Sequence, residues 1–252
     1  MIKVSERDIA KMIDHSLLNP TFTLDEIKRG CKLAKEYHCA TVCVRPCDVP
    51  VAMEILTDSD VKVTTVIGFP HGTNMTETKV FEARFAIEQG CGEIDMVMNI
   101  GMLLSGEYEY VKEDIAAVVI VAHEKNVLVK VILENAYLND DQIKKACEIC
   151  SQAGADFTKT STGYAPSGAT IHDLKIMRAN TPSKMQVKAA GGVRKLDDAL
   201  LVRAVGGTRF GCTRTKEMLE EAKEREAAGI LVLPEIDETS EFASVLEATT
   251  KK

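Results

Sequence analysis

The chain has 252 residues, of which 45% are hydrophobic and 27% are charged, and its formal net charge is −7. This length allows one or two domains, and α/β barrels often fill about 250 residues as a single domain. The negative net charge and the lack of a basic block argue against binding to nucleic acid. They do not exclude a small anionic substrate, because a local cationic pocket can lie in an acidic protein.

The chain shows no signal for a membrane or for export. No apolar run reaches the ~18 residues that a membrane span needs, and the charged N-terminal residues 1–10 lack the apolar part of a secretory signal. Eight cysteines are spread through core-like segments. We therefore expect reduced thiols in a cytoplasmic protein, with no membrane or nucleic-acid partner.

Strand-like apolar runs alternate with helical patterns along nearly the whole chain. The predicted strands are residues 12–17, 40–45, 61–67, 93–99, 127–133, 156–160, 185–190 and 208–212. The predicted helices are residues 24–37, 76–89, 107–125, 140–153, 171–179, 195–205 and 216–228. Eight strands that alternate with seven helices, with nothing inserted, predict a TIM (β/α)₈ barrel in the α/β class. We expect one domain over residues 1–252, with a tail from about residue 229 to which no structure is assigned.

Charged side chains occur at strand positions that should face the barrel interior. Successive side chains on a strand point to opposite faces, so the apolar residues of each strand set its phase. That phase turns five charged residues inward: Asp14, Asp95, Lys130, Lys159 and Lys188. Branched apolar residues normally fill a barrel. The alternatives are a purely structural ion-pair network or a strand phase that is wrong by one residue, but five such charges together indicate a site.

Lys159 and Lys188 suggest chemistry at a carbonyl group. Two neighbouring lysines lower each other's pKa by repulsion, and burial lowers it further. A neutral lysine can then attack a carbonyl and form an imine, which stabilises a carbanion on the adjacent carbon. This is class I aldolase chemistry, and it requires no metal. Asp95 and Lys188 could hold and polarise a water for proton transfer.

Glycines gather where the last two strands end. Gly191 and Gly192 follow the seventh strand, and Gly211, Cys212 and Thr213 precede the last helix. TIM barrels commonly bind phosphate with the loops after strands seven and eight. The position of these glycines therefore favours a phosphate site at the mouth of the barrel.

Several motifs resemble those of the deoxyribose-phosphate aldolase family. They are Met12-Ile13-Asp14-His15, Val66-Ile67-Gly68-Phe69-Pro70, Glu93-Ile94-Asp95-Met96-Val97, Val131-Ile132-Leu133-Glu134, residues 153–163, and Val187-Lys188-Ala189-Ala190-Gly191-Gly192-Val193-Arg194. The resemblance extends from about residue 12 to about residue 217. It implies cleavage of 2-deoxy-D-ribose 5-phosphate to glyceraldehyde 3-phosphate and acetaldehyde. It also implies that no metal or organic cofactor is used, and that the protein is a homodimer.

The resemblance assigns roles to individual residues. Lys159 matches the Schiff-base lysine, Asp95 and Lys188 match the proton-relay pair, and Lys130 matches a further active-site lysine. The residues that match the substrate pocket and its phosphate-binding part are Asp14, Cys43, Thr162, Gly191, Gly192, Gly211, Cys212 and Thr213. The sequence departs from the family pattern at Tyr164, Ala190, Cys212 and His71.

Other interpretations remain open from the sequence alone. Cys39, Cys43 and Cys47 are separated by three residues each, which could suggest a metal site, but the spacing is not that of a standard zinc motif. Because Tyr164 and Cys212 lie where specificity is set, the protein could be a related Schiff-base aldolase or thiolase acting on another sugar phosphate. A third possibility is a catalytically silent barrel that binds a sugar phosphate.

Overall fold

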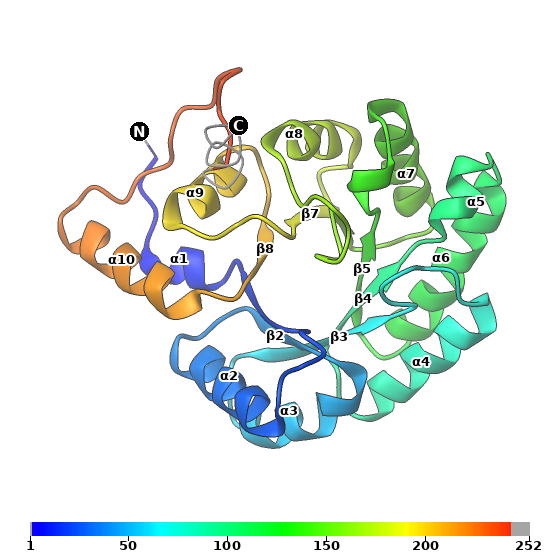
Figure 1. Cartoon of the computed structure of the whole chain (residues 1–252), viewed down its shortest axis with the longest axis horizontal. Helices are drawn as coiled ribbons and strands as arrows, with labels where there is room; N and C mark the ends of the chain where they lie inside the picture. Colours follow the sequence, from blue (N-terminus) through cyan, green and yellow to red (C-terminus); the bar gives the residue numbers. More distant parts are fainter. Residues whose placement is uncertain (1, 243–252) are drawn as a thin grey trace.

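A computed structural model describes residues 2–242, and in it eight parallel strands close into one barrel. Neighbours in the chain are neighbours in the sheet, and β8 pairs back onto β1. The strands are β1 (Ile13–Leu17), β2 (Thr41–Val44), β3 (Lys62–Ile67), β4 (Glu93–Val97), β5 (Leu128–Ile132), β6 (Phe157–Lys159), β7 (Gln186–Ala189) and β8 (Arg209–Cys212). Helices surround the strands when the barrel is viewed as in Figure 1. The predicted (β/α)₈ fold is confirmed.

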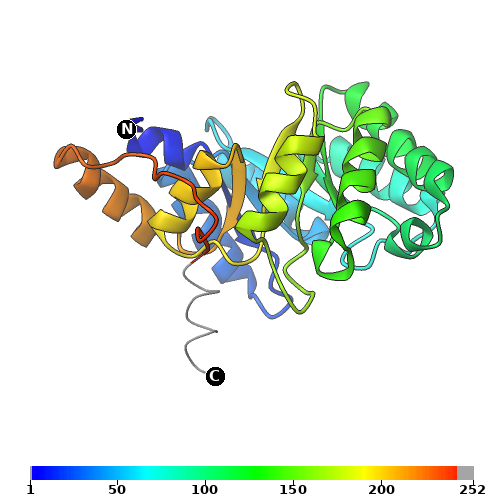
Figure 2. The same ribbon diagram turned by 90° about the horizontal axis from the view of Figure 1, so that it is seen from above.

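The helices follow the strands in chain order, and Figure 2 shows their packing on the outside of the barrel from a second direction. They are α1 (Glu6–Ala10), α2 (Leu24–Glu36), α3 (Val49–Leu56), α4 (Thr76–Glu88), α5 (Ile100–Leu104), α6 (Tyr108–His123), α7 (Asp140–Gln152), α8 (Ile171–Asn180), α9 (Leu196–Ala204) and α10 (Thr215–Ala227). Short 3₁₀ helices lie at Pro46–Asp48 and Asn135–Tyr137. Among residues 2–242, no helix has the length and apolar character needed to cross a membrane.

The predicted elements agree with the structure except for three helices. Every predicted strand lies within two residues of an observed one at both ends. The helix α3 was not predicted, because Pro46 and Pro50 look like signals for a loop. Pro50 lies in the first turn of α3, where the missing N–H costs nothing and the fixed φ suits a helix. The other two missed helices, α1 and α5, have five residues each, too few for a helical period to be visible.

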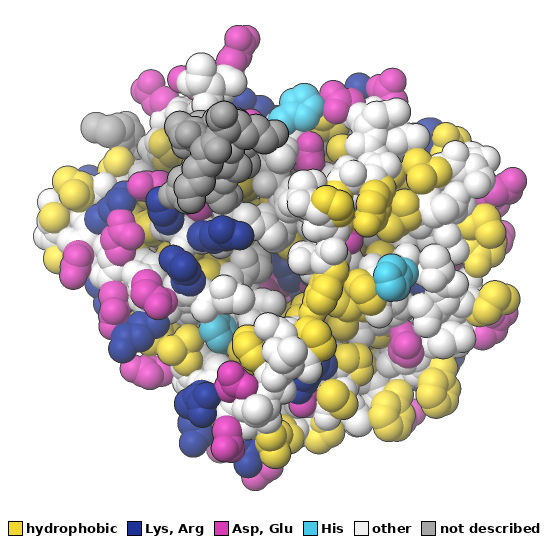
Figure 3. All heavy atoms as spheres, viewed as in Figure 1, with side chains coloured by type: hydrophobic (Ala, Val, Ile, Leu, Met, Phe, Trp, Pro, Cys, Tyr) yellow, Lys and Arg dark blue, Asp and Glu magenta, His cyan; other side chains and the backbone are white. Residues whose placement is uncertain are grey.

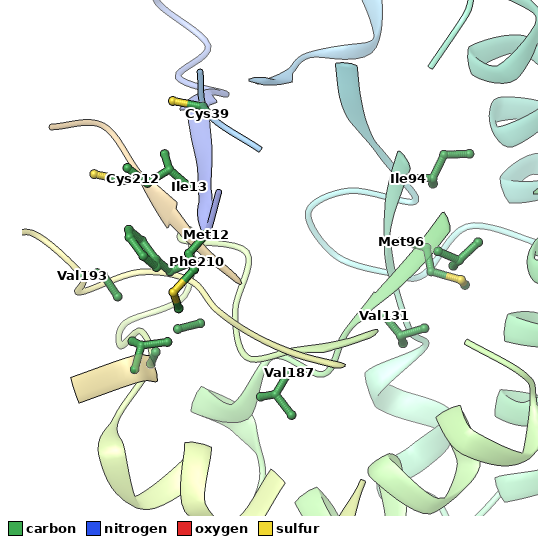
Figure 4. Packing of buried hydrophobic residues seen from close by; sticks show 14 of the residues in the cluster. Met12, Ile13, Cys39, Ile94, Met96, Val131, Val187, Val193, Phe210 and Cys212 are labelled. Carbon is green, nitrogen blue, oxygen red and sulfur yellow. The ribbon is translucent and has the colours of Figure 1, made fainter. Parts of the chain in front are cut away.

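The apolar core lies between the barrel and its helices. The outward-facing side chains of the strands, among them Ile94, Met96, Val131 and Val187, are buried there (Figure 4). Because these apolar residues occupy alternate strand positions, the positions between them face the interior of the barrel. The strand phases expected from the sequence are therefore confirmed for these strands.

The described part of the tail packs against the start of the chain. Leu231 accepts a hydrogen bond from the backbone of Val4, and Leu233 donates one to Ile2. The side chains of Leu231 and Phe242 are buried. No helix or strand element occurs in residues 230–242, in line with the sequence, although this stretch still contributes to the core. The remainder of the predicted tail, residues 243–252, lies outside the described residues.

A buried ion pair joins two helices to the end of β4. Lys79 on α4 and Asp114 on α6 meet at 2.6 Å, and neither side chain is exposed. The ammonium of Lys79 also donates to the carbonyl of Val97 at 3.1 Å, and Asp114 accepts from the hydroxyl of Thr76 at 2.8 Å. This contact holds the strand end two residues beyond Asp95. The pair therefore connects the outer helices to the strand that carries a candidate catalytic residue.

We predict that Asp114→Leu lowers the free energy of unfolding by about 3–5 kcal/mol, because it leaves the Lys79 ammonium buried without a partner. The double variant Lys79→Met/Asp114→Leu should recover most of this loss, since it buries no charge. Urea unfolding followed by circular dichroism measures both. As a control, Glu148→Ala breaks an exposed pair with Lys145 and should cost less than about 1 kcal/mol. A loss below about 1 kcal/mol for Asp114→Leu would contradict this account.

Candidate active site

The five charged residues predicted to face inward lie together in the interior of the barrel. Neighbouring strands place them in register: Asp95 is the Cα partner of Lys130, and Lys159 is the Cα partner of Lys188. Asp14 comes from β1, and its carboxylate accepts a hydrogen bond from Lys188. All five are at most 3% exposed. The period of the strands was thus enough to find the cluster.

The carboxylate of Asp95 is the centre of the cluster. Its Oδ1 accepts a hydrogen bond from Lys130 Nζ at 2.8 Å. Its Oδ2 accepts from Lys159 Nζ at 2.6 Å and from Lys188 Nζ at 2.8 Å. One carboxylate therefore fixes the positions of three amines. Lys159 and Lys188, the two lysines with predicted catalytic roles, both donate to the same oxygen atom of Asp95.

Two further charged residues extend the cluster toward the other end of the barrel. Glu93 on β4 accepts from Lys130 at 2.5 Å. Arg209 on β8 donates to Asp14 at 2.7 Å and to Glu93 at 3.0 Å. The guanidinium of Arg209 also lies 5.3 Å from the centre of the Phe157 ring, within the range of a cation–π contact.

The cluster contains more positive than negative groups. Four cationic side chains meet three carboxylates, so an excess of one positive charge remains when every group is ionised. The groups are Lys130, Lys159, Lys188 and Arg209 on one side and Asp14, Glu93 and Asp95 on the other. Excess charge in a buried site is unfavourable, and it is removed when one lysine loses its proton.

Lys159 is the lysine that is favoured to lose its proton. Burial lowers the pKa of Lys159 below its usual value, and the positive charge of Lys188 adds to this against the opposing effect of Asp95. Burial also acts on Lys188, but the carboxylates of Asp14 and Asp95 outweigh it, and the pKa of Lys188 is raised. The expectation that the two lysines lower each other's pKa is therefore wrong for Lys188, because Asp14 gives it a carboxylate that Lys159 lacks.

Asp95 and Lys130 are held in their charged forms by their neighbours. Burial opposes ionisation of Asp95, but the three lysines around it hold its pKa well below the usual value. The carboxylates Asp95 and Asp14 likewise overcome the effect of burial and raise the pKa of Lys130. Together these directions make Lys159 the amine of the cluster whose neutral form is most favoured, although it is hydrogen-bonded to a carboxylate.

A cavity of about 420 Å³ opens onto this cluster. Lys159, Lys188, Asp14 and Cys43 contribute to its wall. The other predicted pocket residues also line it, and these are Thr162, Gly191, Gly192, Gly211, Cys212 and Thr213. Lys159 is 3% exposed, so its amine is shielded from bulk water but accessible from the cavity. This volume suits a small metabolite.

Two of the predicted site residues lie behind the cavity. Asp95 and Lys130 are both 0% exposed and are not part of its wall. Asp95 contacts the amines of Lys159 and Lys188, which do line the cavity. Lys130 contacts Asp95 and Glu93. Lys130, which the family resemblance assigned to the substrate pocket, therefore lies behind the cavity wall, where its charge meets those of Asp95 and Glu93.

The loop after β7 brings backbone close to backbone at the rim of the cavity. Gly191 has φ +71°, and its carbonyl accepts from the N–H of Ala169 at 2.8 Å. A Cβ on Gly168 would lie 2.4 Å from that carbonyl oxygen, so glycine is required there. Arg194, three residues beyond Gly191, also lines the cavity and supplies a cation next to these glycines. This is the type of rim that binds a phosphate group.

The loop after β6 is anchored by a buried glutamate. The carboxylate of Glu134, at the end of β5, accepts from the hydroxyl of Thr162 and from its N–H, the latter at 3.1 Å. The hydroxyl of Thr162 in turn accepts from the N–H of Tyr164 at 3.0 Å. Glu134 has φ +55°, which is unfavourable for a residue with a side chain. These contacts fix the loop that forms one wall of the cavity.

The cysteines are free thiols in the structure. Burial raises the pKa of Cys43, in the cavity wall, to about 11, so it is protonated at neutral pH. Cys39 is buried and Cys47 is exposed. Within residues 2–242, no group of three or more His, Cys, Asp or Glu side chains is arranged to hold a metal ion.

Four residues of the site were not identified from the sequence. Glu93 and Arg209 obey the same alternation that revealed Asp95, so the strand phase could have found them. Arg194 lies two residues after the Gly191-Gly192 pair, and a cation beside a glycine turn is a usable signal. Glu134 is in phase with Lys130 and closes one of the family motifs, but its contact with Thr162, 28 residues away, has no local signal.

Known proteins resemble this chain over most of its length. A family model described as DeoC/LacD family aldolase matches residues 9–234. A deoxyribose-phosphate aldolase of Caldanaerobacter subterraneus is 51% identical over 228 residues, which is 89% of this chain and 99% of that protein. A deoxyribose-phosphate aldolase of Thermococcus gammatolerans is 49% identical and covers 87% of this chain and 98% of its own length.

Solved structures agree with these relatives. A putative deoxyribose-phosphate aldolase from Coccidioides immitis superimposes with a TM-score of 0.84 at 39% identity, covering 88% of each chain. The deoxyribose phosphate aldolase from Aeropyrum pernix, described as a unique tetrameric structure, gives 0.81 at 30% identity, covering 87% of this chain and 92% of that one. The barrel with its buried lysine cluster, the family match over residues 9–234 and the relatives at about half identity lead to one conclusion: the chain belongs to the DeoC/LacD family of aldolases.

Proposed function

We propose that this aldolase cleaves 2-deoxy-D-ribose 5-phosphate to D-glyceraldehyde 3-phosphate and acetaldehyde through a Schiff base on Lys159. The observation that carries the proposal is the state of Lys159, the one lysine of the cluster that lines the cavity and has a lowered pKa. A neutral amine is the form that attacks a carbonyl carbon. The names of the relatives supply the substrate, and the cavity supplies room for it.

The reaction follows from the positions of the amines. Lys159 Nζ attacks the aldehyde carbon of the open-chain sugar, and loss of water gives a protonated imine. The bond between C2 and C3 then breaks as the C3 hydroxyl loses its proton, and the electron pair moves to the iminium nitrogen. The resulting enamine takes a proton at C2, and water releases acetaldehyde and regenerates Lys159.

Lys188 and Asp95 serve the proton transfers in this proposal. Lys188 lines the cavity and stays protonated, because Asp14 and Asp95 raise its pKa. It can therefore donate a proton through a water and recover one. Asp95 touches the Nζ atoms of Lys159 and Lys188, so it holds both amines in place while charge moves between them. No metal or organic cofactor is needed for these steps.

The phosphate end of the substrate belongs at the glycine-rich rim in this proposal. Gly191 and Gly192 offer backbone groups to the cavity, whose wall also includes Thr162 and, at the end of β8 and just after it, residues 211–213. Arg194 adds a positive charge at the rim. An anion here would lie beyond the reacting aldehyde, so that the sugar spans the cavity from Lys159 to its mouth.

We also propose that the protein is a cytoplasmic homodimer formed by a single-domain chain. Phe81 and Phe85 on α4 stack at 6.3 Å although they are 68% and 54% exposed. Figure 3 shows hydrophobic side chains on the part of the surface that α4 forms, at the lower right. Exposed aromatic pairs of this kind favour contact with another protein surface. Light scattering after size-exclusion chromatography tests the dimer, and Phe81→Glu should shift it to monomer.

We predict that Lys159→Leu lowers turnover of 2-deoxyribose 5-phosphate by at least about 10⁴-fold, because the nucleophile is lost. Asp95→Asn and Lys188→Leu should lower it by about 10²–10⁴-fold. A retro-aldol assay coupled to NADH oxidation measures all three. Lys144→Leu, which removes an exposed lysine on α7, is the control and should keep full activity. An active Lys159→Leu variant would refute the proposed mechanism.

The same assay separates the alternative substrates. Ribose 5-phosphate and fructose phosphates should turn over far more slowly than 2-deoxyribose 5-phosphate. Preference for one of them would instead indicate a related aldolase whose specificity is set by Tyr164 and Cys212. Absence of any product, together with binding of the sugar phosphate, would indicate a silent barrel.

We predict opposite shifts in the pH dependence of imine formation for two variants. Acetaldehyde and cyanoborohydride trap the imine, and the rate should rise with pH as Lys159 loses its proton. In Lys188→Leu the neighbouring cation is gone, so the pKa of Lys159 rises and the rate profile moves to higher pH. In Asp95→Asn the carboxylate that favours the ammonium is gone, so the profile moves to lower pH. Mass spectrometry follows the adduct, and equal shifts in both variants would contradict the charge model.

A further inference from the structure

Tyr164 lies between the catalytic cavity and a second cavity at the mouth of the barrel. The second cavity has a volume of about 270 Å³ and lies at the ends of β2 and β3. Three residues line both cavities, namely Leu18, Pro20 and Tyr164. Tyr164 is therefore part of the wall between the catalytic cavity and the second cavity.

The ring of Tyr164 is held at both ends. At its base, the backbone N–H donates to the hydroxyl of Thr162, which Glu134 anchors to the end of β5. At its tip, the phenolic hydroxyl donates to the carbonyl of Leu18 at 2.8 Å. The ring also meets Phe69 edge to face, with centroids 5.5 Å apart and planes at 87°. Tyr164, although 49% exposed, thus connects the loops after β6, β1 and β3.

The second cavity suits an uncharged, apolar group. Its wall is formed mainly by apolar side chains, among them Val66, Ile67, Phe69 and Pro70. The two charged residues in it have partners already. Arg45 donates to Asp48 at 2.6 Å, and Glu82 accepts from the N–H of Gly68 at 2.7 Å. A phosphate group would bind better at the rim near Gly191 and Arg194, which offers a cation and backbone groups.

We propose that Tyr164 is a specificity-determining residue that keeps the apolar chain of an aldehyde out of the second cavity, which would otherwise act as a subsite for it. The proposal rests on the proposed function, because it concerns the same Lys159 chemistry run in the direction of synthesis. Acetaldehyde condenses with Lys159, releases water and becomes an enamine. Its C2 forms a bond to the carbonyl carbon of a second aldehyde, whose oxygen takes a proton, and water then releases a 3-hydroxyaldehyde.

Removal of the ring should join the two cavities. In Tyr164→Ala the hydroxyl contact to Leu18 and the ring contact to Phe69 are both lost, and the space between the cavities opens. An alkyl chain on the acceptor aldehyde could then extend from Lys159 toward Val66 and Pro70. Each methylene that leaves water there contributes a factor of about four in kcat/KM. In Tyr164→Phe the ring and its contact with Phe69 remain, so the wall between the cavities stays closed.

The test compares acceptor aldehydes with acetaldehyde as donor. We measure kcat/KM for butanal, hexanal and D-glyceraldehyde 3-phosphate in the wild-type protein, Tyr164→Ala and Tyr164→Phe. The ratio of hexanal to D-glyceraldehyde 3-phosphate should rise at least about tenfold in Tyr164→Ala and change less than about threefold in Tyr164→Phe. The gain should be larger for hexanal than for butanal. Adding Val66→Phe to Tyr164→Ala fills the second cavity and should remove the gain.

Two results would overturn the proposal. A ratio that is unchanged in Tyr164→Ala, or raised equally in Tyr164→Phe, means that the ring is not the barrier. A gain that survives Val66→Phe means that the chain lies elsewhere. Both differ from failure of the proposed function, in which the wild-type protein neither cleaves 2-deoxyribose 5-phosphate nor forms a trapped adduct on Lys159. Thermal unfolding of each variant identifies a loss of fold, and Tyr164→Leu then replaces Tyr164→Ala as the variant with a truncated side chain.

Discussion

In the middle of the barrel, one carboxylate accepts hydrogen bonds from three lysines, and each of those ammonium groups would be costly to bury without it. Asp95 holds Lys159 and Lys188 on the same oxygen atom and Lys130 on the other. The three lysines lie on β5, β6 and β7, and closure of the parallel sheet turns these strands and β4 toward one common interior. The ion pair of Lys79 with Asp114 fixes the end of β4 from outside the barrel. Helix packing and active-site geometry are therefore linked through a single strand.

The reactivity of Lys159 follows from the shortage of carboxylates in the cluster. Four cations meet three carboxylates, and Asp14 and Glu93 are committed to Lys188, Lys130 and Arg209. Lys159 shares only the oxygen of Asp95 that Lys188 also uses, so it gains least from remaining charged. When Lys159 is neutral, the cluster has equal numbers of positive and negative charges. Formation of the protonated imine returns a positive charge to this nitrogen, close to the carboxylate of Asp95. The pKa values of the two amines that face the cavity thus shift in opposite directions because of one neighbouring aspartate.

Much of this could be predicted from the sequence because strands have a strict period of two residues. The apolar positions around Asp95 and Lys159 set the phase, and the charged residues between them had to meet inside the barrel. Tyr164 was noticed only as a departure from a family pattern, since loops have no period and its contacts with Leu18 and Phe69 come from distant segments. The helix α3 was not predicted, because Pro46 and Pro50 are compatible both with a loop and with the start of a helix. The raised pKa of Lys188 depends on the contact with Asp14 across 174 residues, which no local pattern contains.

The central claim is that the cluster lowers the pKa of Lys159 while it raises the pKa of Lys188. An NMR titration of ¹³Cε-labelled lysine, with Lys159 assigned by its absence from the Lys159→Arg variant, measures this most directly. The account predicts a midpoint for Lys159 below the ordinary 10.5, and no titration of Lys188 up to that pH. A midpoint for Lys159 at or above 10.5, or a lower midpoint for Lys188 than for Lys159, would contradict it.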